Sequence, residues 1–255
     1  MATRLYLNES QAGAINIGAQ VGTLWEQNIS GAFTTKRART TPDNNANASH
    51  NTSSLGNGSN PCDICFGQFL TDTMPSGVLI DGTIEGVICC REGNTSDNMY
   101  TQLAAYVVDS SGALVHTLLG GSTSGGTELN SASANTRDMP RGGAKTLSSY
   151  TTVNSTSRIV IEIGLRTEST RTTCQGLMYF GSGDTSDLPT GDGTSNNLLI
   201  RPWVQFSADI FTPPSGGGAR AQASAFYGSY HQDPEHGAWK RRSRSGLWVR
   251  SWEEA

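Results

Sequence analysis

Two cysteines with C-x-x-C spacing are the residues best suited to hold a metal. Cys62 and Cys65 could supply half of a tetrahedral zinc site. The second half is poorly supplied, because Cys89 and Cys90 are adjacent and would point to opposite faces of a strand. We therefore expect buried free thiols, with a disulfide and zinc as successively weaker alternatives. A zinc site could use only one of Cys89 and Cys90, which leaves Cys174 or His50 as the fourth ligand.

A Gly-rich loop carries three aspartates whose oxygen atoms are weak candidates for calcium ligands. They are Asp184, Asp187 and Asp192. Calcium takes several oxygen ligands at close spacing, but this spacing does not match an EF-hand loop. Ordinary Asp/Gly turns explain the pattern equally well, and no motif predicts a cofactor.

The chain shows no recognisable catalytic pattern, so we expect it not to be an enzyme. No nucleophile has a base at a familiar spacing. Glu162 is expected on the outward face of a strand, with Arg158 and Arg166 about 13 Å away on either side. A glycosidase needs two carboxylates about 5–10 Å apart. Many acidic pairs could satisfy that requirement, which keeps a glycan hydrolase as a third hypothesis.

The last part of the chain differs from the rest, because aromatic and basic residues are concentrated after a Pro/Gly-rich stretch at 212–218. The segment 219–255 is too short to bury so many aromatic side chains in a core of its own. We expect these residues to bind a surface of the body or of a neighbouring subunit. The candidates are Phe226, Tyr227, Tyr230, Trp239, Arg241, Arg242, Trp248 and Trp252.

The basic run 240–244 allows two interpretations. Nucleic-acid contact would combine its cations with stacking on Trp239 and Trp248. An assembly anchor would place the aromatics in pockets and pair the arginines with carboxylates at the rim. We favour the anchor, because the run is short and Glu253 and Glu254 close the chain.

Composition favours strands and turns over helices. Charged residues make up 16% of the 255 residues, while Gly, Ser, Thr and Asn, which disfavour helices, are abundant. Residues 1–211 hold 12 basic and 18 acidic side chains, a charge of −6, which predicts no nucleic-acid surface there. No segment has the roughly 20 apolar residues of a membrane span, and no signal peptide is expected, so we predict a soluble protein made in a cytosol.

The strand signals predict an all-β body. Ser157–Thr167 alternates most clearly, with Ile159, Ile161 and Ile163 on one face. Met99–Ser110 and Ala113–Leu119 are expected to form a hairpin. About eight to ten short strands predict an antiparallel β-sandwich, jelly-roll-like, over residues 1–211. A linker at 212–218 and an extended C-terminal arm at 219–255 complete the predicted organisation.

Five segments of the body resemble accessory structural proteins of tailed bacteriophages: head-decoration, head-fibre and tail-associated β-sandwich proteins. This resemblance implies a structural virion component, assembled in the host bacterial cytoplasm and located in the virion. It implies other virion proteins, major capsid or tail proteins, as partners, and a homo-oligomer such as a trimer. The segments are Arg4–Leu7, Trp25-Glu26, Ile80–Gly86, Arg158–Gly164 and Trp203–Ser207.

A carbohydrate-binding adhesin, or receptor-binding module of a phage particle, is the main alternative. The long polar segments 34–61 and 120–146 could present side chains to a host glycan. We expect no membrane partner and regard nucleic acid as the weaker partner hypothesis.

Overall fold

The chain divides into two compact units, Met1–Pro213 and Pro214–Ala255. This computed structural model describes residues 2–42, 48–51, 61–181, 186–193, 200–212, 230–232, 239–242 and 248–250. The predicted linker and most of the predicted arm lie outside the described residues, so the domain assignment stays a prediction. Each unit is described by itself below.

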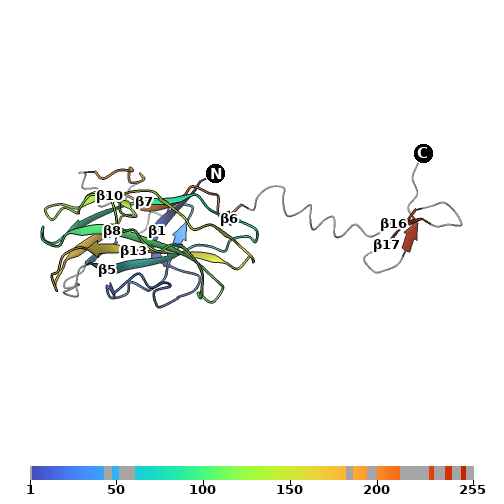
Figure 1. The fold of residues 1–255 in the computed structure, drawn as a ribbon, viewed down its shortest axis with the longest axis horizontal. Coiled ribbons are helices and arrows are strands. Elements are labelled where there is room, and N and C mark those ends of the chain that lie inside the picture. The colour runs from blue at the N-terminus through green and yellow to red at the C-terminus, as the bar shows by residue number, and fades with distance from the viewer. Residues whose placement is uncertain are drawn as a thin grey trace. The chain divides into compact units, whose positions relative to one another are not determined.

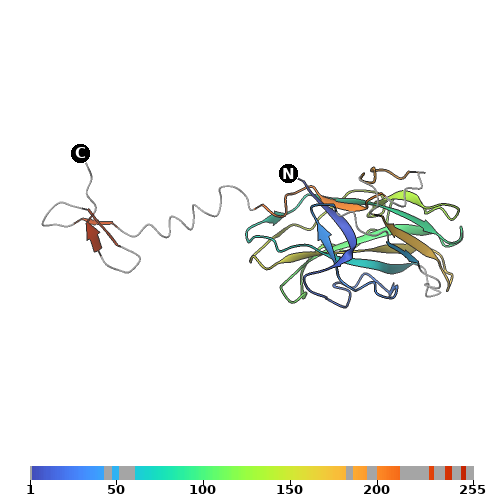
Figure 2. The ribbon, with the colours of Figure 1, turned by 180° about the vertical axis from the view of Figure 1, so that it is seen from behind.

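Strands make up the described regular structure of the first unit, and this part of the chain contains no helix that could cross a membrane. Figures 1 and 2 show the strands of this unit from two opposite sides. They are β1 (Thr3–Ala12), β2 (Gln27–Asn28), β3 (Lys36–Arg39), β4 (Ala48–Asn51), β5 (Cys62–Leu70), β6 (Leu79–Ile80), β7 (Thr83–Glu92), β8 (Met99–Val108), β9 (Leu114–Leu119), β10 (Asn135–Met139), β11 (Lys145–Thr146), β12 (Tyr150–Thr151), β13 (Arg158–Thr167), β14 (Gly176–Phe180) and β15 (Trp203–Phe206).

The prediction of an antiparallel, jelly-roll-like sandwich is wrong, because one large mixed sheet dominates the unit. Its main path runs β4-β14-β7-β15-β1-β3-β5-β13-β8-β9, with β2, β10 and β11 attached at the side. Both β2 and β3 pair with β5 in parallel, whereas the other pairs of this sheet are antiparallel. Parallel neighbours need a long crossover connection, and the chain between β3 and β5 includes β4, which pairs with β14 at the end of the strand order.

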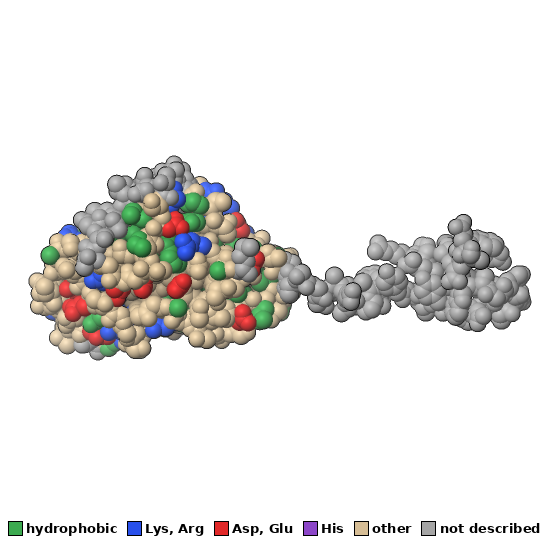
Figure 3. All heavy atoms as spheres, turned by 90° about the horizontal axis from the view of Figure 1, so that it is seen from above, with side chains coloured by type: hydrophobic (Ala, Val, Ile, Leu, Met, Phe, Trp, Pro, Cys, Tyr) green, Lys and Arg blue, Asp and Glu red, His purple; other side chains and the backbone are tan. Residues whose placement is uncertain are grey.

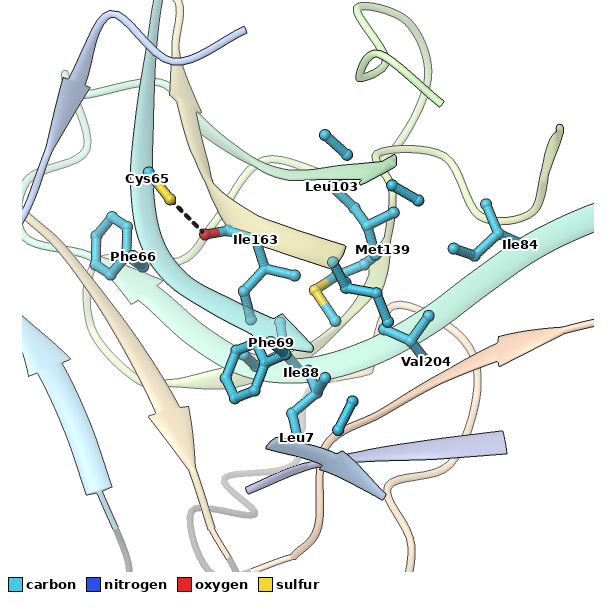
Figure 4. Close-up of a cluster of buried hydrophobic side chains, with 14 of the residues drawn as sticks. Leu7, Cys65, Phe66, Phe69, Ile84, Ile88, Leu103, Met139, Ile163 and Val204 are labelled. Atoms are coloured by element: carbon cyan, nitrogen blue, oxygen red, sulfur yellow. Dashed lines mark hydrogen bonds between the residues drawn. The ribbon is translucent and has the colours of Figure 1, made fainter. Parts of the chain in front are cut away.

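The hydrophobic core lies between distant parts of the strand order. Leu7 on β1, Ile88 on β7 and Val204 on β15 belong to the same buried cluster as Phe69 on β5 and Ile163 on β13. Figure 4 shows Leu7 and Ile88 pointing toward the ring of Phe69. Each fully buried side chain of this kind contributes about 1.5–3 kcal/mol. The core therefore joins β7, β15 and β1, from one half of the strand order, to β5 and β13 from the other half.

The other face of β13 is also buried, although the sequence pattern had predicted only one buried face. Leu70, Val108 and Val160 form a second cluster, against which Ile15 and Ile17 pack from the segment between β1 and β2. The strand β13 therefore has an apolar neighbour on both faces. Its alternation of Ile with other residues had suggested that one face meets water.

The prediction that Glu162 faces outward is accordingly wrong, since its side chain is 0% exposed. Its carboxylate accepts hydrogen bonds from Val21 N at 2.9 Å, Trp25 Nε1 at 2.7 Å and Gln68 Nε2 at 2.9 Å. Burial raises the pKa of this carboxyl, while these donors act in the opposite direction. Glu162 thus ties the segment that carries Val21 and Trp25 to the sheet.

Candidate functional site

The predicted zinc candidates Cys62 and Cys65 lie buried on β5. No disulfide joins the five cysteines, all of which lie in the described part of the chain. Among the described residues there is no group of three or more His, Cys, Asp or Glu side chains that could hold a metal ion. Burial raises the pKa of the Cys62 thiol to about 12, with Glu26 adding to the effect, so this thiol stays protonated at neutral pH when no metal is bound.

Two of the aspartates proposed for calcium accept hydrogen bonds from protein donors. Asp187 Oδ2 accepts from Arg4 Nη1 at 2.8 Å and from the Tyr6 hydroxyl at 2.9 Å. Asp192 accepts backbone N–H groups of Thr127 at 3.0 Å and of Asp138 at 3.1 Å. Asp184 lies outside the described residues.

The predicted partner-binding residues belong to the second unit. Phe226, Tyr227 and Trp252 lie outside the described residues. The other candidates lie on three short strands: β16 (Tyr230–Gln232) carries Tyr230, β17 (Trp239–Arg242) carries Trp239, Arg241 and Arg242, and β18 (Trp248–Arg250) carries Trp248. Whether these residues bind a partner stays a prediction.

A cluster of polar side chains that no sequence pattern indicated surrounds Tyr100, at the start of β8. The guanidinium carbon of Arg141 lies 3.4 Å from the centre of the Tyr100 ring, a cation–π contact. Arg141 also pairs with the carboxylate of Glu168, just after β13. The backbone of Glu168 donates to Asn98 O at 3.0 Å, and Asn98 has a left-handed φ of 45°. Three separate chain segments therefore meet at this point, around residues 98–100, 141 and 168.

Two hollows of about 430 Å³ each lie in this region. The first is lined by Pro61, Asn98, Tyr100 and Glu168. The second, which we call the Glu92 hollow, is lined by Glu92, Thr95, Glu128, Asn130, Ser131 and Arg137, among others. Burial raises the pKa of the Tyr100 hydroxyl and Arg141 opposes this, while Glu128, Glu168 and Glu92 raise it further. The acidic groups of both hollows therefore act on the same ring.

Glu92 is the unusual group of this cluster, because it is buried with little hydrogen-bond support. Its side chain is 1% exposed, and Oε2 accepts the Met99 N–H at 3.1 Å. Within the described part of the chain no donor reaches Oε1. Burial, followed by the charges of Glu128 and Asp97, raises the pKa of Glu92 to about 7, although the Met99 N–H lowers it. This carboxyl is therefore about half protonated at neutral pH.

Arg137 lines the Glu92 hollow, but among the described residues it donates no hydrogen bond to the carboxylate of Glu92 or of Glu128. Its Nη1 donates to the carbonyl oxygens of Thr136 and Gly193, both at 2.9 Å. Its Nη2 donates to the backbone oxygen of Glu128 at 3.0 Å. The guanidinium therefore joins the segments that form the wall, and the Glu92 and Glu128 carboxylates lack a cationic hydrogen-bond donor among the described residues.

The sequence held little signal for this site. Glu92 directly follows Arg91 and precedes Gly93, a pattern typical of an exposed strand end. The burial comes from the turn 93–98 and from the segment around Glu128, which lie against the end of β7.

Figure 3 shows one face of the first unit, where acidic and basic side chains are interspersed and hydrophobic side chains form only small groups.

Comparison with known proteins gives distant structural likenesses. No family model matches the chain, and no curated protein matches it. Two solved structures of a CocE/NonD family hydrolase from Staphylococcus aureus match with TM-scores of 0.43 and 0.37 at 10% and 8% identity. They cover 82% and 81% of this chain. An α-amino acid ester hydrolase matches with a TM-score of 0.33 at 8% identity, covering 82% of this chain.

The chain spans about a third (36%) of the length of each of these hydrolases. The comparisons therefore contradict the predicted resemblance to phage structural proteins, since the structures found are hydrolases. The same finding contradicts the predicted virion function and its adhesin and glycan-hydrolase alternatives. It also contradicts the expectation that the protein is not an enzyme. At this identity and TM-score no activity or site residue is transferred to this chain. The expected partners and location are untested and stay predictions.

Proposed function

We propose that the first unit is a ligand-binding domain whose ligand carries a primary ammonium group held in the Glu92 hollow. One observation carries the proposal: the carboxylate of Glu92, a residue that is 1% exposed, accepts a single hydrogen bond among the described residues and borders a hollow large enough for a small molecule. Glu128 adds a second carboxylate to the same wall.

The chemistry of an ammonium group matches what this hollow lacks. An ammonium has three N–H donors and no acceptor, and hydrogen bonds to a carboxylate are strengthened by the opposite charges. Glu128 and the ionised form of Glu92 supply negatively charged acceptors, while Thr95, Asn130 and Ser131 supply neutral polar groups. An anionic ligand would instead meet two carboxylates at short range.

The raised pKa of Glu92 links this binding to pH. The ligand binds the ionised carboxylate, so affinity is highest above about pH 7 and falls as the pH drops below it. Binding at pH 6 should release a proton, because the ammonium displaces it from Glu92. Binding to a permanently ionised surface carboxylate would show no such release.

The test uses butylamine as the cationic probe and butanol as its uncharged counterpart. Titration calorimetry on the full chain should show weak binding of butylamine, stronger at pH 8 than at pH 6, and no binding of butanol. Glu92→Gln should abolish the pH dependence and weaken binding at pH 8 about tenfold or more. Glu85→Gln, on the same strand but partly exposed, is the matched control and should bind as the parent does.

Two outcomes would contradict the proposal. One is equal binding of butylamine and butanol, and the other is unchanged butylamine binding by the Glu92→Gln variant. Peak shifts in an NMR spectrum of Glu92→Gln that stay confined to the hollow would show that this variant remains folded.

A second candidate function is acid–base catalysis at the same carboxyl, favoured by its pKa of about 7. A group that is half protonated near neutrality can both accept and donate a proton, as a general acid or base of a hydrolase does. Turnover of p-nitrophenyl acetate that rises with pH through about 7 and disappears in Glu92→Gln would favour catalysis. Binding of butylamine without any turnover would favour the first proposal.

A further inference from the structure

The three strands of the second unit form a small antiparallel sheet in the order β16-β17-β18. The pairing register places His231 opposite Lys240, and Lys240 opposite Arg250. It also places Arg242 opposite Trp248. Directly opposed residues share a face of a sheet, and so do residues two apart on one strand.

The register therefore sorts the basic residues unequally between the two faces. One face, which we call the basic face, has Lys240, Arg242 and Arg250 together with His231 and Trp248. The other face has Arg241 as its only basic residue among the described positions, together with Tyr230, Gln232, Trp239 and Val249. The basic run in the sequence is thus split, with its members alternating between the faces.

The described positions of the basic face include no acidic residue that could balance its charge. Lys240 lies directly opposite Arg250, and like charges in this position destabilise a sheet. The stretch 239–250 contains five basic residues and no acidic residue. An anion bound on this face would relieve the repulsion, and several phosphates would do so better than one.

We propose that the basic face binds single-stranded nucleic acid. Its three cations match successive backbone phosphates, and Trp248 provides a ring on which an unstacked base can lie, a combination used by single-strand binding proteins. A duplex keeps its bases stacked inside, so it would leave the tryptophan without a partner. The sheet is only about 10 Å wide, which suits one strand.

The test measures binding of the full chain to fluorescein-labelled dT20 and rU20 by fluorescence anisotropy over a range of salt concentrations. Three phosphate contacts predict a slope of log K against log salt of about −2, since each contributes about −0.7 for a single strand. A duplex of the same length should bind less tightly. DNA and RNA are two sources of the same chemistry, and either one binding supports the proposal.

Neighbouring residues on opposite faces give matched controls. Arg242→Gln should reduce the salt slope by about 0.7 and weaken binding several-fold, whereas Arg241→Gln should change binding little. Trp248→Leu should weaken binding about fivefold or more at an unchanged slope, because a stacked base is worth about 1–3 kcal/mol. Trp239→Leu should bind as the parent does. Arg242→Lys keeps the positive charge, so it should bind nearly as tightly as the parent and more tightly than Arg242→Gln.

Equal losses in Arg241→Gln and Arg242→Gln would overturn the proposal, because binding would then depend on charge alone and not on one face. Duplex binding as tight as that of dT20 would overturn it as well. Binding to phosphatidylserine vesicles without binding to either oligonucleotide would assign the basic face to an anionic membrane surface and would also overturn it.

Discussion

Glu92 and Glu162 are both buried carboxylates, and the number of their donors separates their roles. Glu162 accepts three hydrogen bonds from two segments of the first unit, the one that carries Val21 and Trp25 and the strand β5, which makes it a structural tie. Glu92 accepts one from a backbone N–H and faces a hollow. A buried carboxylate with unused acceptor capacity beside an open space is more typical of a binding site than of a core.

We predict that Glu162→Ala destabilises the first unit by about 3 kcal/mol or more. The substitution leaves Val21 N, Trp25 Nε1 and Gln68 Nε2 without their acceptor, and each buried unsatisfied donor costs about 1–3 kcal/mol. Urea denaturation followed by tryptophan fluorescence measures the change. Glu85→Ala, with a partly exposed side chain, should stay within about 0.5 kcal/mol of the parent.

We also predict that the unfolding free energy falls as pH rises from about 4.5 to above 7. The pKa of Glu92 is about 7 in the folded state and 4.5 as its ordinary value, so the folded state binds the proton more tightly. The stabilising contribution is therefore complete below pH 4.5 and lost as pH rises through about 7, up to about 3 kcal/mol.

Glu92→Gln should flatten that part of the stability profile, because glutamine does not titrate. Urea denaturation at several pH values measures both curves. A parent profile that rises between pH 5 and 8, or a Glu92→Gln profile with the same slope as the parent, would contradict the assigned cause.

At the scale of elements, the sequence predicted individual strands better than their arrangement. The strand expected at Ser157–Thr167 is β13, Arg158–Thr167, and the expected hairpin is formed by β8 and β9, which pair antiparallel. Alternation reports which residues are apolar, but it does not report the direction of a neighbouring strand. The parallel pairing of β2 and β3 with β5 depends on the route of the chain between them.

The site was missed for a related reason. The burial of Glu92 and the contact between Tyr100 and Arg141 depend on turns that bring separate segments together. A Glu at a strand end and an Arg in a Gly-rich segment both predict exposure when read locally. The adjacent cysteines were easier, because strand geometry alone places Cys89 and Cys90 on different faces, and they do lie in different buried clusters.

One element-scale prediction concerns the irregularity in the pairing of β13 with β5, between Ile163 and Gly164. A Cβ atom at Gly164 would lie 2.0 Å from Ile64 O and 2.8 Å from the Trp25 ring. Gly164→Ala should therefore destabilise the unit by about 3 kcal/mol, as measured by thermal and urea unfolding. Gly120→Ala is the control, since its nearest neighbouring atom would be at 3.8 Å, and an equal loss there would refute the steric explanation.

At the scale of the whole molecule, the two units differ in charge and in composition. Residues 1–213 hold 12 basic and 18 acidic side chains, a net charge of −6, and residues 214–255 hold 6 and 4, a net charge of +2. The acidic first unit offers carboxylates to a cationic ligand, and the basic second unit offers cations to a polyanion. The two proposed functions therefore need ligands of opposite charge and can be tested separately.

We predict that a chain shortened to residues 1–213 folds on its own. The buried cluster that holds Leu5, Phe69, Ile163 and Val204 lies entirely within the first unit. The shortened chain should give a strand-type circular dichroism spectrum and a cooperative urea transition, and it should bind butylamine as the full chain does. A broad, non-cooperative transition would show that the second unit is needed for folding.

The pairing of β1 with β15 joins the two ends of the first unit, with Thr3 opposite Phe206 and the Thr3 N–H bonded to Ala208 O at 3.2 Å. During synthesis on a ribosome, β1 emerges first but lacks one of its two neighbours until about two hundred more residues have followed. The nascent chain must therefore keep an open strand edge away from other chains, which is a period of exposure to aggregation. The same proximity makes the unit suited to circular permutation, with new termini cut into a surface loop.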